Sequence, residues 1–217
     1  MSKRYLVIGA GRFGSSVAKT LFELGHEVVV VDKDVARVQQ MSELVTKAVQ
    51  ADATSEGSLN ALGMGGFDVA IVAIGGDIQA SIMASILLIE AGARYIVANA
   101  QTEMHGKTLA KIGVNRIVFP QRDMGQKLAH SLSAFNIVDL VELSSGSNVV
   151  EVIAPAEMVG RTLEELKFRA LYGINVIALR GKDGTTNISP GAEDKIGEGD
   201  LIIAVGEYKA LRKLGWV

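Results

Sequence analysis

The sequence lacks cysteine, long apolar runs and any large excess of one charge. Without cysteine there are no disulfide bonds, cysteine-ligated metals or thiolate nucleophiles. No window reaches the roughly 18 apolar residues of a membrane-spanning helix. A formal net charge of -2 provides no bulk attraction to nucleic acid or anionic lipid. With 48% hydrophobic residues and no room for a signal peptide before the first motif, we expect a soluble globular protein.

A glycine-rich motif follows the first apolar run of the chain. The run at 5–8 is typical of a buried strand, GAGRFG follows at 9–14, and apolar residues at helical spacing continue to residue 24. This order is that of a dinucleotide-binding motif, in which Gly9 permits the tight turn and Gly11 lets backbone approach a pyrophosphate. Gly14 lets the helix lie close to the strand, and the helix N-terminus offers N–H groups to phosphates.

An acidic residue lies at the expected distance beyond this motif. The second apolar run, 27–31, ends in Asp32, which is 18 positions after Gly14. That is close to the spacing of about 20 typical of a carboxylate that binds a ribose hydroxyl. The alternative is a glycine turn in unliganded α/β packing, with Asp32 as a solvated strand end.

Strands and helices continue to alternate to about residue 120. We expect strands at 47–50, 69–74, 95–99 and 116–119, and helices at 35–44, 56–62, 78–90 and 103–111. With the first two strands, these make a Rossmann-type, doubly wound parallel sheet of six strands in an α/β domain. Ligands of such sheets bind beyond the carboxyl ends of the strands, so the glycine loop, Asp32, Asp52 and the loop at Gly75 should converge on one crevice.

The expected helix at 78–90 is apolar around nearly its whole circumference. Helices of a doubly wound domain lie outside the sheet, so the outer face of this apolar helix must pack against another element. Either another subunit or the chain's own second domain would supply it.

The pattern changes after residue 136. A helix at 123–136, with Met124, Leu128, Leu132 and Phe135 in one stripe, connects to strands at 149–153, 176–179 and 201–205. Helices are expected at 162–168 and 207–214, and Asp183-Gly184 marks a hairpin between two of the strands. We therefore divide the chain into a nucleotide-binding domain, 1–136, and a small α+β domain, 137–217.

Catalytic chemistry is hard to find in this sequence. A dehydrogenase needs a proton donor or acceptor beside the nicotinamide. His26 precedes the second strand, at the edge opposite the crevice, whereas His105 and His130 lie on helices without a partner acid pattern. We interpret all three as packing or solvated residues, and no spacing indicates a metal site. An NAD-dependent oxidoreductase with a small substrate domain remains the alternative.

Segments from both halves closely resemble the KtrA- and TrkA-type regulators of potassium conductance, or RCK proteins. The segments are GAGRFG, VVVVDKD, QADAT, VAIVAIGGD, IVANAQ and FPQRDMGQKLAHSL, then VGRTLEELKFRALYGINVIALRG and NISPGAEDKIGEGDLIIAVG. The resemblance covers almost the whole chain. It implies an RCK N-domain and C-domain, and a non-enzymatic gating subunit of a bacterial potassium uptake system.

The resemblance further implies a homo-octameric ring assembled from dimers. The ring would be cytoplasmic, peripheral to the inner face of the membrane, and docked on a potassium transporter subunit of the KtrB or TrkH type, with no nucleic acid partner. Exchange of ATP, ADP or NAD(H) would change its shape and hence conductance. The implied nucleotide site consists of Gly9, Gly11, Arg12, Phe13, Gly14, Asp32, Lys33, Asp52, Ala53, Thr54, Ile74, Gly75 and Asn99.

Arg12 stands out because relatives use this arginine to reach a terminal phosphate, including that of a neighbouring subunit. A guanidinium forks onto phosphate oxygens and stays charged. The alternative is a surface arginine at a helix N-terminus.

Two residues depart from the family pattern, and the C-terminal half suggests a second ligand. Gln121 replaces a glutamate that serves a divalent cation in many relatives, so we assign no metal. Asn99 replaces a common lysine, and either change would weaken a preference for ATP relative to NAD. Some relatives bind cyclic di-AMP in the C-domain, and Arg169, Asn175 and Pro190 lie in the matching segments. The alternative for Arg169 is a helix-end cation, and for Asn175 a turn residue.

Overall fold

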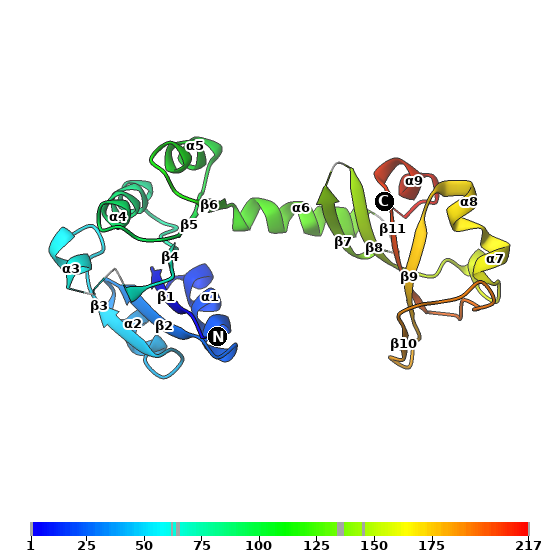
Figure 1. Cartoon of the computed structure of the whole chain (residues 1–217), viewed down its shortest axis with the longest axis horizontal. Coiled ribbons are helices and arrows are strands. Elements are labelled where there is room, and N and C mark those ends of the chain that lie inside the picture. Colours follow the sequence, from blue (N-terminus) through cyan, green and yellow to red (C-terminus); the bar gives the residue numbers. More distant parts are fainter. Residues whose placement is uncertain (1, 62, 64–65, 134–136, 145, 217) are drawn as a thin grey trace. The chain divides into compact units, whose positions relative to one another are not determined.

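The computed structural model describes residues 2–216, except 62, 64–65, 134–136 and 145 (Figure 1). It consists of two compact units, an N-terminal unit of residues 1–122 and a C-terminal unit of residues 123–217. The predicted domain boundary after residue 136 lies outside the described residues. None of the helices in the described part is long and apolar enough to cross a membrane.

The N-terminal unit is built on one parallel sheet of six strands. They are β1 (Arg4–Ile8), β2 (Glu27–Asp32), β3 (Lys47–Gln50), β4 (Val69–Val72), β5 (Ile96–Asn99) and β6 (Arg116–Val118). Their order is β3-β2-β1-β4-β5-β6, with every described pairing parallel. Successive strands are therefore added in one direction from β1 to β3 and in the opposite direction from β4 to β6. The junction of β1 and β4 is the switch point of this doubly wound sheet. The predicted Rossmann-type sheet is confirmed.

Helices cover both faces of this sheet (Figure 1). They are α1 (Arg12–Glu23), α2 (Val35–Met41), α3 (Glu56–Asn60), α4 (Ile78–Glu90) and α5 (Glu103–Lys111). Val7 of β1 packs in one apolar cluster with Ala18 of α1. Leu6, on the opposite face, packs in a second cluster with Leu88 of α4. Burial on both faces explains why the central strands are continuous apolar runs.

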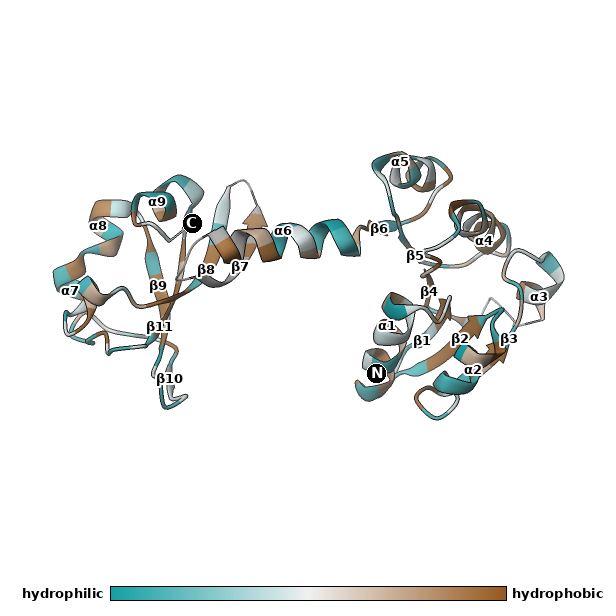
Figure 2. Cartoon of the chain, turned by 180° about the vertical axis from the view of Figure 1, so that it is seen from behind, coloured by the Kyte–Doolittle hydropathy of each residue, from teal (hydrophilic) through white to brown (hydrophobic). Residues whose placement is uncertain are grey.

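Helix α4 buries only part of its apolar surface within the N-terminal unit. Ala84 and Leu88 are fully buried, whereas Met83 is 42% exposed and Ile78 is 38% exposed. Figure 2 colours most of α4 in the brown of hydrophobic residues. The sheet thus covers the inner face, and the outer face of α4 remains apolar and open within this unit.

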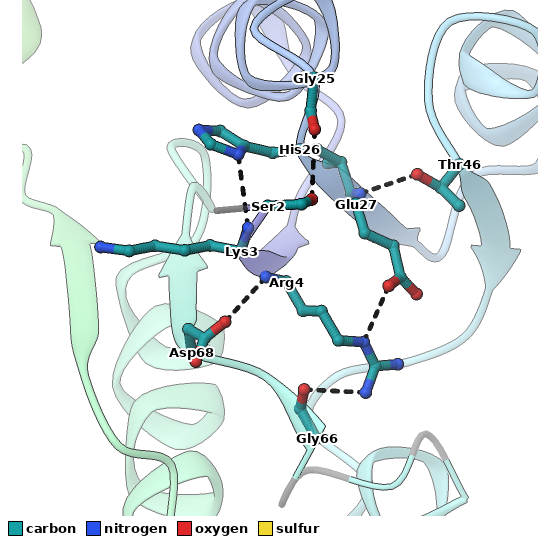
Figure 3. A network of polar contacts seen from close by, with 10 residues as sticks. Ser2, Lys3, Arg4, Gly25, His26, Glu27, Thr46, Gly66 and Asp68 are labelled. Carbon is teal, nitrogen blue, oxygen red and sulfur yellow. Dashed lines mark hydrogen bonds and ion pairs between the residues drawn. The ribbon is translucent and has the colours of Figure 1, made fainter.

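A polar network fixes the strand starts at the edge opposite the glycine loop (Figure 3). The Arg4 N–H donates to Asp68 Oδ2 at 2.9 Å, and the Arg4 guanidinium donates to Glu27 and to the Gly66 carbonyl. At the same edge His26 Nδ1 accepts from the Lys3 N–H, and the His26 ring packs 5.2 Å from that of Tyr5. His26 therefore contacts the scaffold, far along the strands from the glycine loop.

The C-terminal unit contains an antiparallel sheet, which confirms the α+β prediction. Its strands are β7 (Ile137–Ser144), β8 (Ser147–Ile153), β9 (Asn175–Arg180), β10 (Thr186–Asn187) and β11 (Leu201–Glu207), in the order β10-β9-β11-β8-β7. The three predicted strands correspond to β8, β9 and β11. The helical segments are the 3-10 turn η2 (Ala156–Met158), α7 (Leu163–Leu166), α8 (Phe168–Tyr172) and α9 (Tyr208–Lys213).

Two details of the C-terminal unit differ from expectation. The helix predicted at 162–168 is broken by Lys167, which takes a left-handed conformation with φ 47°. Thr162 and Glu165 cap α7 reciprocally, and the break lets Phe168 become buried at the start of α8. The Asp183-Gly184 turn does form a hairpin, but it joins β9 to the short β10 rather than to β11.

Helix α6 (Pro120–Ser133) begins earlier than the predicted 123–136. Proline suits the first helical position because its missing N–H has no intrahelical partner there. Met124, Leu128 and Leu132 lie on α6 and are 56–73% exposed, whereas Phe135 lies outside the described residues.

Candidate nucleotide-binding site

A cleft of about 920 Å³ opens at the carboxyl ends of the central strands of the N-terminal unit. It is lined by every residue of the predicted nucleotide set except Gly14. It also contains residues outside that set, namely Ile8, Val31, Arg37, Ala51, Ala73, Gly76, Asp77, Ala80 and Gln121. The doubly wound topology thus collects residues from the loops after β1, β2, β3 and β4, from the end of β5 and from the start of α6. Ligands of such sheets bind at this switch point.

Gly9 and Gly14 let the glycine loop pack tightly. Gly9 has φ 99°, which disfavours any residue with a side chain, and its added Cβ would lie 3.0 Å from the Ala73 carbonyl. A Cβ on Gly14 would overlap the Gly9 carbonyl oxygen. Gly14 is therefore needed for the close approach of α1 to β1.

Gly11 differs from these two because nothing in the fold requires a glycine there. Its φ of -71° suits any residue, and an added Cβ would meet no atom within 4 Å. Gly11 nevertheless lines the cleft, immediately before α1. A position that is sterically free within the chain and still lacks a side chain fits the close approach of a ligand.

Asp32 is buried at the end of β2, with 8% of its surface exposed. Its Oδ2 accepts from the Ala10 N–H at 2.7 Å, and its Oδ1 accepts from the Asp34 N–H at 2.9 Å. The carboxylate therefore joins the glycine loop to the β2–α2 turn. Each carboxylate oxygen has a second lone pair, so Asp32 also retains the capacity to accept from a ribose hydroxyl.

Asp52 and Thr54 form a small turn on the same side of the cleft. The Thr54 hydroxyl and N–H both donate to Asp52 Oδ1, at 2.7 and 2.9 Å. These bonds lower the pKa of Asp52, the hydroxyl contributing most, with Lys33 adding a smaller charge effect. Asp52 thus stays ionised in a fixed orientation, with its other oxygen unengaged by these bonds.

Arg37 is a cleft residue that the sequence interpretation missed. Its guanidinium lies 3.7 Å from Asp32 Oδ2 and 3.6 Å from Asp34, and about half of its side chain is exposed. With Arg12 and Lys33 it brings three cations to the half of the cleft formed by β1 and β2. The sequence could have indicated Arg37, because it lies five residues after Asp32, on the first turn of the helix that follows the crevice.

Asn99 and Gln121 lie in the other half of the cleft. Asn99 ends β5 and is 2% exposed, and its Oδ1 has no hydrogen-bond partner among the residues described. Gln121 is exposed in the first turn of α6. The buried, unpaired amide oxygen fits a cleft that accepts a polar ligand, because native interiors rarely leave such atoms unpaired.

The proposed second-ligand residues are separate from this cleft and belong to the C-terminal unit. Arg169 is exposed on α8, Asn175 is exposed at the start of β9, and Pro190 is half-buried after β10. In the part of the chain that is described, no hydrogen bond joins the three side chains.

Comparison with known proteins assigns the family. Residues 5–120 match the TrkA-N domain family, and residues 149–215 match the TrkA-C domain family. The chain is 42% identical to Ktr system potassium uptake protein C of Bacillus subtilis over 207 residues, which cover 95% of this chain and 93% of that protein. The chain belongs to the TrkA/KtrA family.

Other TrkA/KtrA relatives and solved structures agree. Ktr system potassium uptake protein A of Bacillus subtilis is 39% identical, over 98% of this chain and 95% of that one. Among solved structures, the GsuK RCK domain superposes with a TM-score of 0.52 at 25% identity, covering 98% of this chain and 45% of that chain. A GsuK channel bound to NAD gives a TM-score of 0.53 at 25% identity, with 98% and 38% covered. The chain thus spans less than half of the GsuK chains.

The two histidines of this TrkA/KtrA chain whose side chains are described, His26 and His105, contact neighbouring parts of the fold. His105 is 2% exposed in the first turn of α5, and its Nδ1 accepts from the Gln101 N–H at 3.3 Å. The His130 side chain lies outside the described part. Within that part, no group of three or more His, Asp or Glu side chains is arranged to hold a metal ion.

Burial lowers the pKa of His105, which predicts a pH-dependent stability. The folded chain holds the neutral ring, whereas the unfolded chain protonates near pH 6.5. The stability that the folded chain gains from holding the neutral ring is therefore fully present above about pH 6.5. It is lost as the pH falls toward the lowered pKa of His105 in the folded chain. Urea unfolding from pH 8 to 5 should show this loss, and His105→Asn, which retains an acceptor, should reduce it. Equal pH profiles for both proteins would contradict the prediction.

Proposed function

We propose that this chain is a nucleotide-sensing regulatory subunit that gates a membrane potassium transporter. The observation that carries the proposal is a cleft lined by the glycine-rich motif, within a chain that aligns with 93% of a Ktr potassium uptake protein. Its relatives named above are potassium uptake proteins, which favours this function over an NAD-dependent oxidoreductase. In this proposal the cleft senses an adenine nucleotide, ATP, ADP or NAD(H), and performs no reaction on it.

The proposed nucleotide lies along the carboxyl edge of the parallel sheet. Gly9, Gly11 and the N-terminus of α1 hold its phosphates, with Arg12 reaching a terminal phosphate. Asp32 binds the ribose, and Asp52 with Thr54 faces the adenosine side. Lys33, Phe13, Ala53, Ile74, Gly75 and Asn99 complete the contact surface.

The proposed partners are copies of this chain and a transporter subunit of the KtrB or TrkH type. The apolar outer face of α4, with Met83 42% exposed, supports a contact between subunits because isolated chains rarely present such a helix face. We propose dimers that assemble into an octameric ring on the cytoplasmic side of the membrane. Cyclic di-AMP at Arg169, Asn175 and Pro190 of the C-terminal unit is a further proposal.

The function is tested by potassium flux in liposomes that contain the transporter. Adding the purified chain should make flux depend on adenine nucleotide, and light scattering should give a mass well above 23.0 kDa. Gly11→Ala is the matched control, since it alters the ligand surface without disturbing packing. A strictly monomeric chain would refute the proposal. Flux that does not depend on nucleotide with either the wild-type chain or Gly11→Ala would also refute it.

A further inference from the structure

An aromatic ring lies at the point where β6 gives way to α6. Phe119 follows the last residue of β6 and precedes Pro120, the first residue of α6. Its side chain is half-buried and packs against the apolar cluster that contains Leu88. The N-terminal unit ends at residue 122, whereas α6 continues to Ser133. Phe119 is thus the C-terminal member of this cluster, directly before the helix that leaves the N-terminal unit.

Gly106 leaves open the space that the Phe119 ring occupies. It is buried near the start of α5, and a Cβ added there would lie 2.5 Å from Phe119 Cζ. The three atoms nearest to that Cβ all belong to the Phe119 ring. Two bonds fix the start of α5: the Thr102 hydroxyl oxygen accepts from the His105 N–H, and His105 Nδ1 accepts from the Gln101 N–H. Gly106 therefore forms a fixed notch for the tip of the ring.

Arg122 contacts the same ring from α6. Its guanidinium carbon lies 3.9 Å from the centroid of the Phe119 ring, which is the geometry of a cation–π contact. Arg122 belongs to the first turn of α6. The Phe119 ring thus contacts α5 at its tip and α6 across its face, and it joins the two helices.

The residue between Phe119 and Arg122 belongs to the cleft. Gln121 lines the cleft and is exposed in the first turn of α6. The N–H groups of a first helical turn have no intrahelical partners, so helix ends fray. Order in this turn of α6 therefore depends on what Gln121 contacts and on how the Phe119 ring is held.

We infer that Phe119 is a positioning residue that transmits occupancy of the cleft to α6. The inference rests on the proposed nucleotide-sensing function. A nucleotide that contacts Gln121 binds best when the first turn of α6 is ordered, and so shifts the chain toward that state. The ring, seated between Gly106 and Arg122, makes α6 follow. Phe119 is not among the residues that line the cleft, so displacing its ring leaves nucleotide binding intact.

Hydrogen–deuterium exchange of the full chain, with and without saturating NADH or ADP, tests this inference. In the wild-type chain nucleotide should slow exchange at residues 121–127 at least about fivefold, because ordering a helix end protects its amides. In Gly106→Ala the new methyl group displaces the ring, and this slowing should fall below about twofold. The calorimetric affinity for nucleotide should stay within about threefold of the wild-type value.

Gly125→Ala is the matched control, because it makes the same change on α6 where no atom lies within 4 Å of the added Cβ. It should keep the full response to nucleotide. Phe119→Ala should lose the response, and Gly106→Ala should add nothing in that background, since its methyl group acts through the ring. Thermal unfolding checks that each variant is folded, and Gly106→Ala decides the question alone if Phe119→Ala unfolds.

A purely structural role of the ring predicts a different pattern. Exchange of α6 in Gly106→Ala would then rise equally with and without nucleotide, and the unchanged ratio would overturn the inference. Loss of nucleotide affinity in Gly106→Ala would also overturn it, because Phe119 would then serve binding. Binding by the wild-type chain without slower exchange in α6 would overturn the inference and leave the sensing function standing. A wild-type chain that binds neither NADH nor ADP would refute the nucleotide-sensing function itself.

Discussion

Gly14→Ala is expected to destabilise the chain by about 3 kcal/mol and to abolish nucleotide binding. The new Cβ would overlap the Gly9 carbonyl oxygen and lie 2.9 Å from the Ala73 Cβ. Because Gly14 is buried and the nearest atom belongs to the backbone, no side-chain rotation relieves the overlap. Helix α1 must then move away from β1, which displaces the phosphate-binding turn. Urea unfolding and NADH calorimetry of the full chain measure the two effects.

Gly11→Ala is the matched control, with the same chemical change three residues earlier. No atom lies within 4 Å of its added Cβ, so stability should stay within about 1 kcal/mol of the wild-type value, the range for an N-cap change. Nucleotide affinity should still fall at least about tenfold, because a methyl group occupies the surface that a phosphate approaches. Normal nucleotide binding by Gly11→Ala would show that the pyrophosphate does not lie against this loop. Normal stability of Gly14→Ala would show that close helix–strand contact is dispensable.

The N-terminal fold was predictable because its signals are local and agree with one another. Apolar runs of strand length alternate with helical periodicity, and Asp32 ends the second run at the spacing of a nucleotide motif. The order of the strands follows from right-handed connections in a doubly wound sheet. The structure then brings the predicted loop residues to one cleft, although their contact with a ligand stays a prediction.

The features that were missed depend on contacts between distant residues. Strand β7 was not predicted, and it completes the edge of the second sheet, which includes β9 and β11 from much later in the chain. The break at Lys167 depends on burying Phe168, which local helix propensity does not record. Likewise, the unpaired oxygen of Asn99 and the approach of Arg37 to Asp32 exist only after the strands assemble.

Asp32 presents a sharper problem, because its carboxylate serves the fold as well as the proposed ligand. Asp32→Ala removes the partners of the Ala10 and Asp34 N–H groups, so weaker binding alone would not demonstrate a ribose contact. Comparing ADP with 2′,3′-dideoxy-ADP separates the two roles. Loop displacement affects both ligands equally, whereas a bond to ribose hydroxyls exists only with ADP.

We expect the wild-type chain to prefer ADP over the dideoxy ligand by about tenfold to a hundredfold, as hydrogen bonds to a carboxylate predict. In Asp32→Ala this ratio should fall to about one while both affinities decrease. Asp52→Ala is the control, because Asp52 contacts Thr54 and should leave the ratio at its wild-type value. A ratio unchanged by Asp32→Ala would confine Asp32 to positioning the glycine loop. If the preference for ADP disappears only in Asp52→Ala, the ribose is instead bound by the turn at Asp52, which follows the neighbouring strand β3.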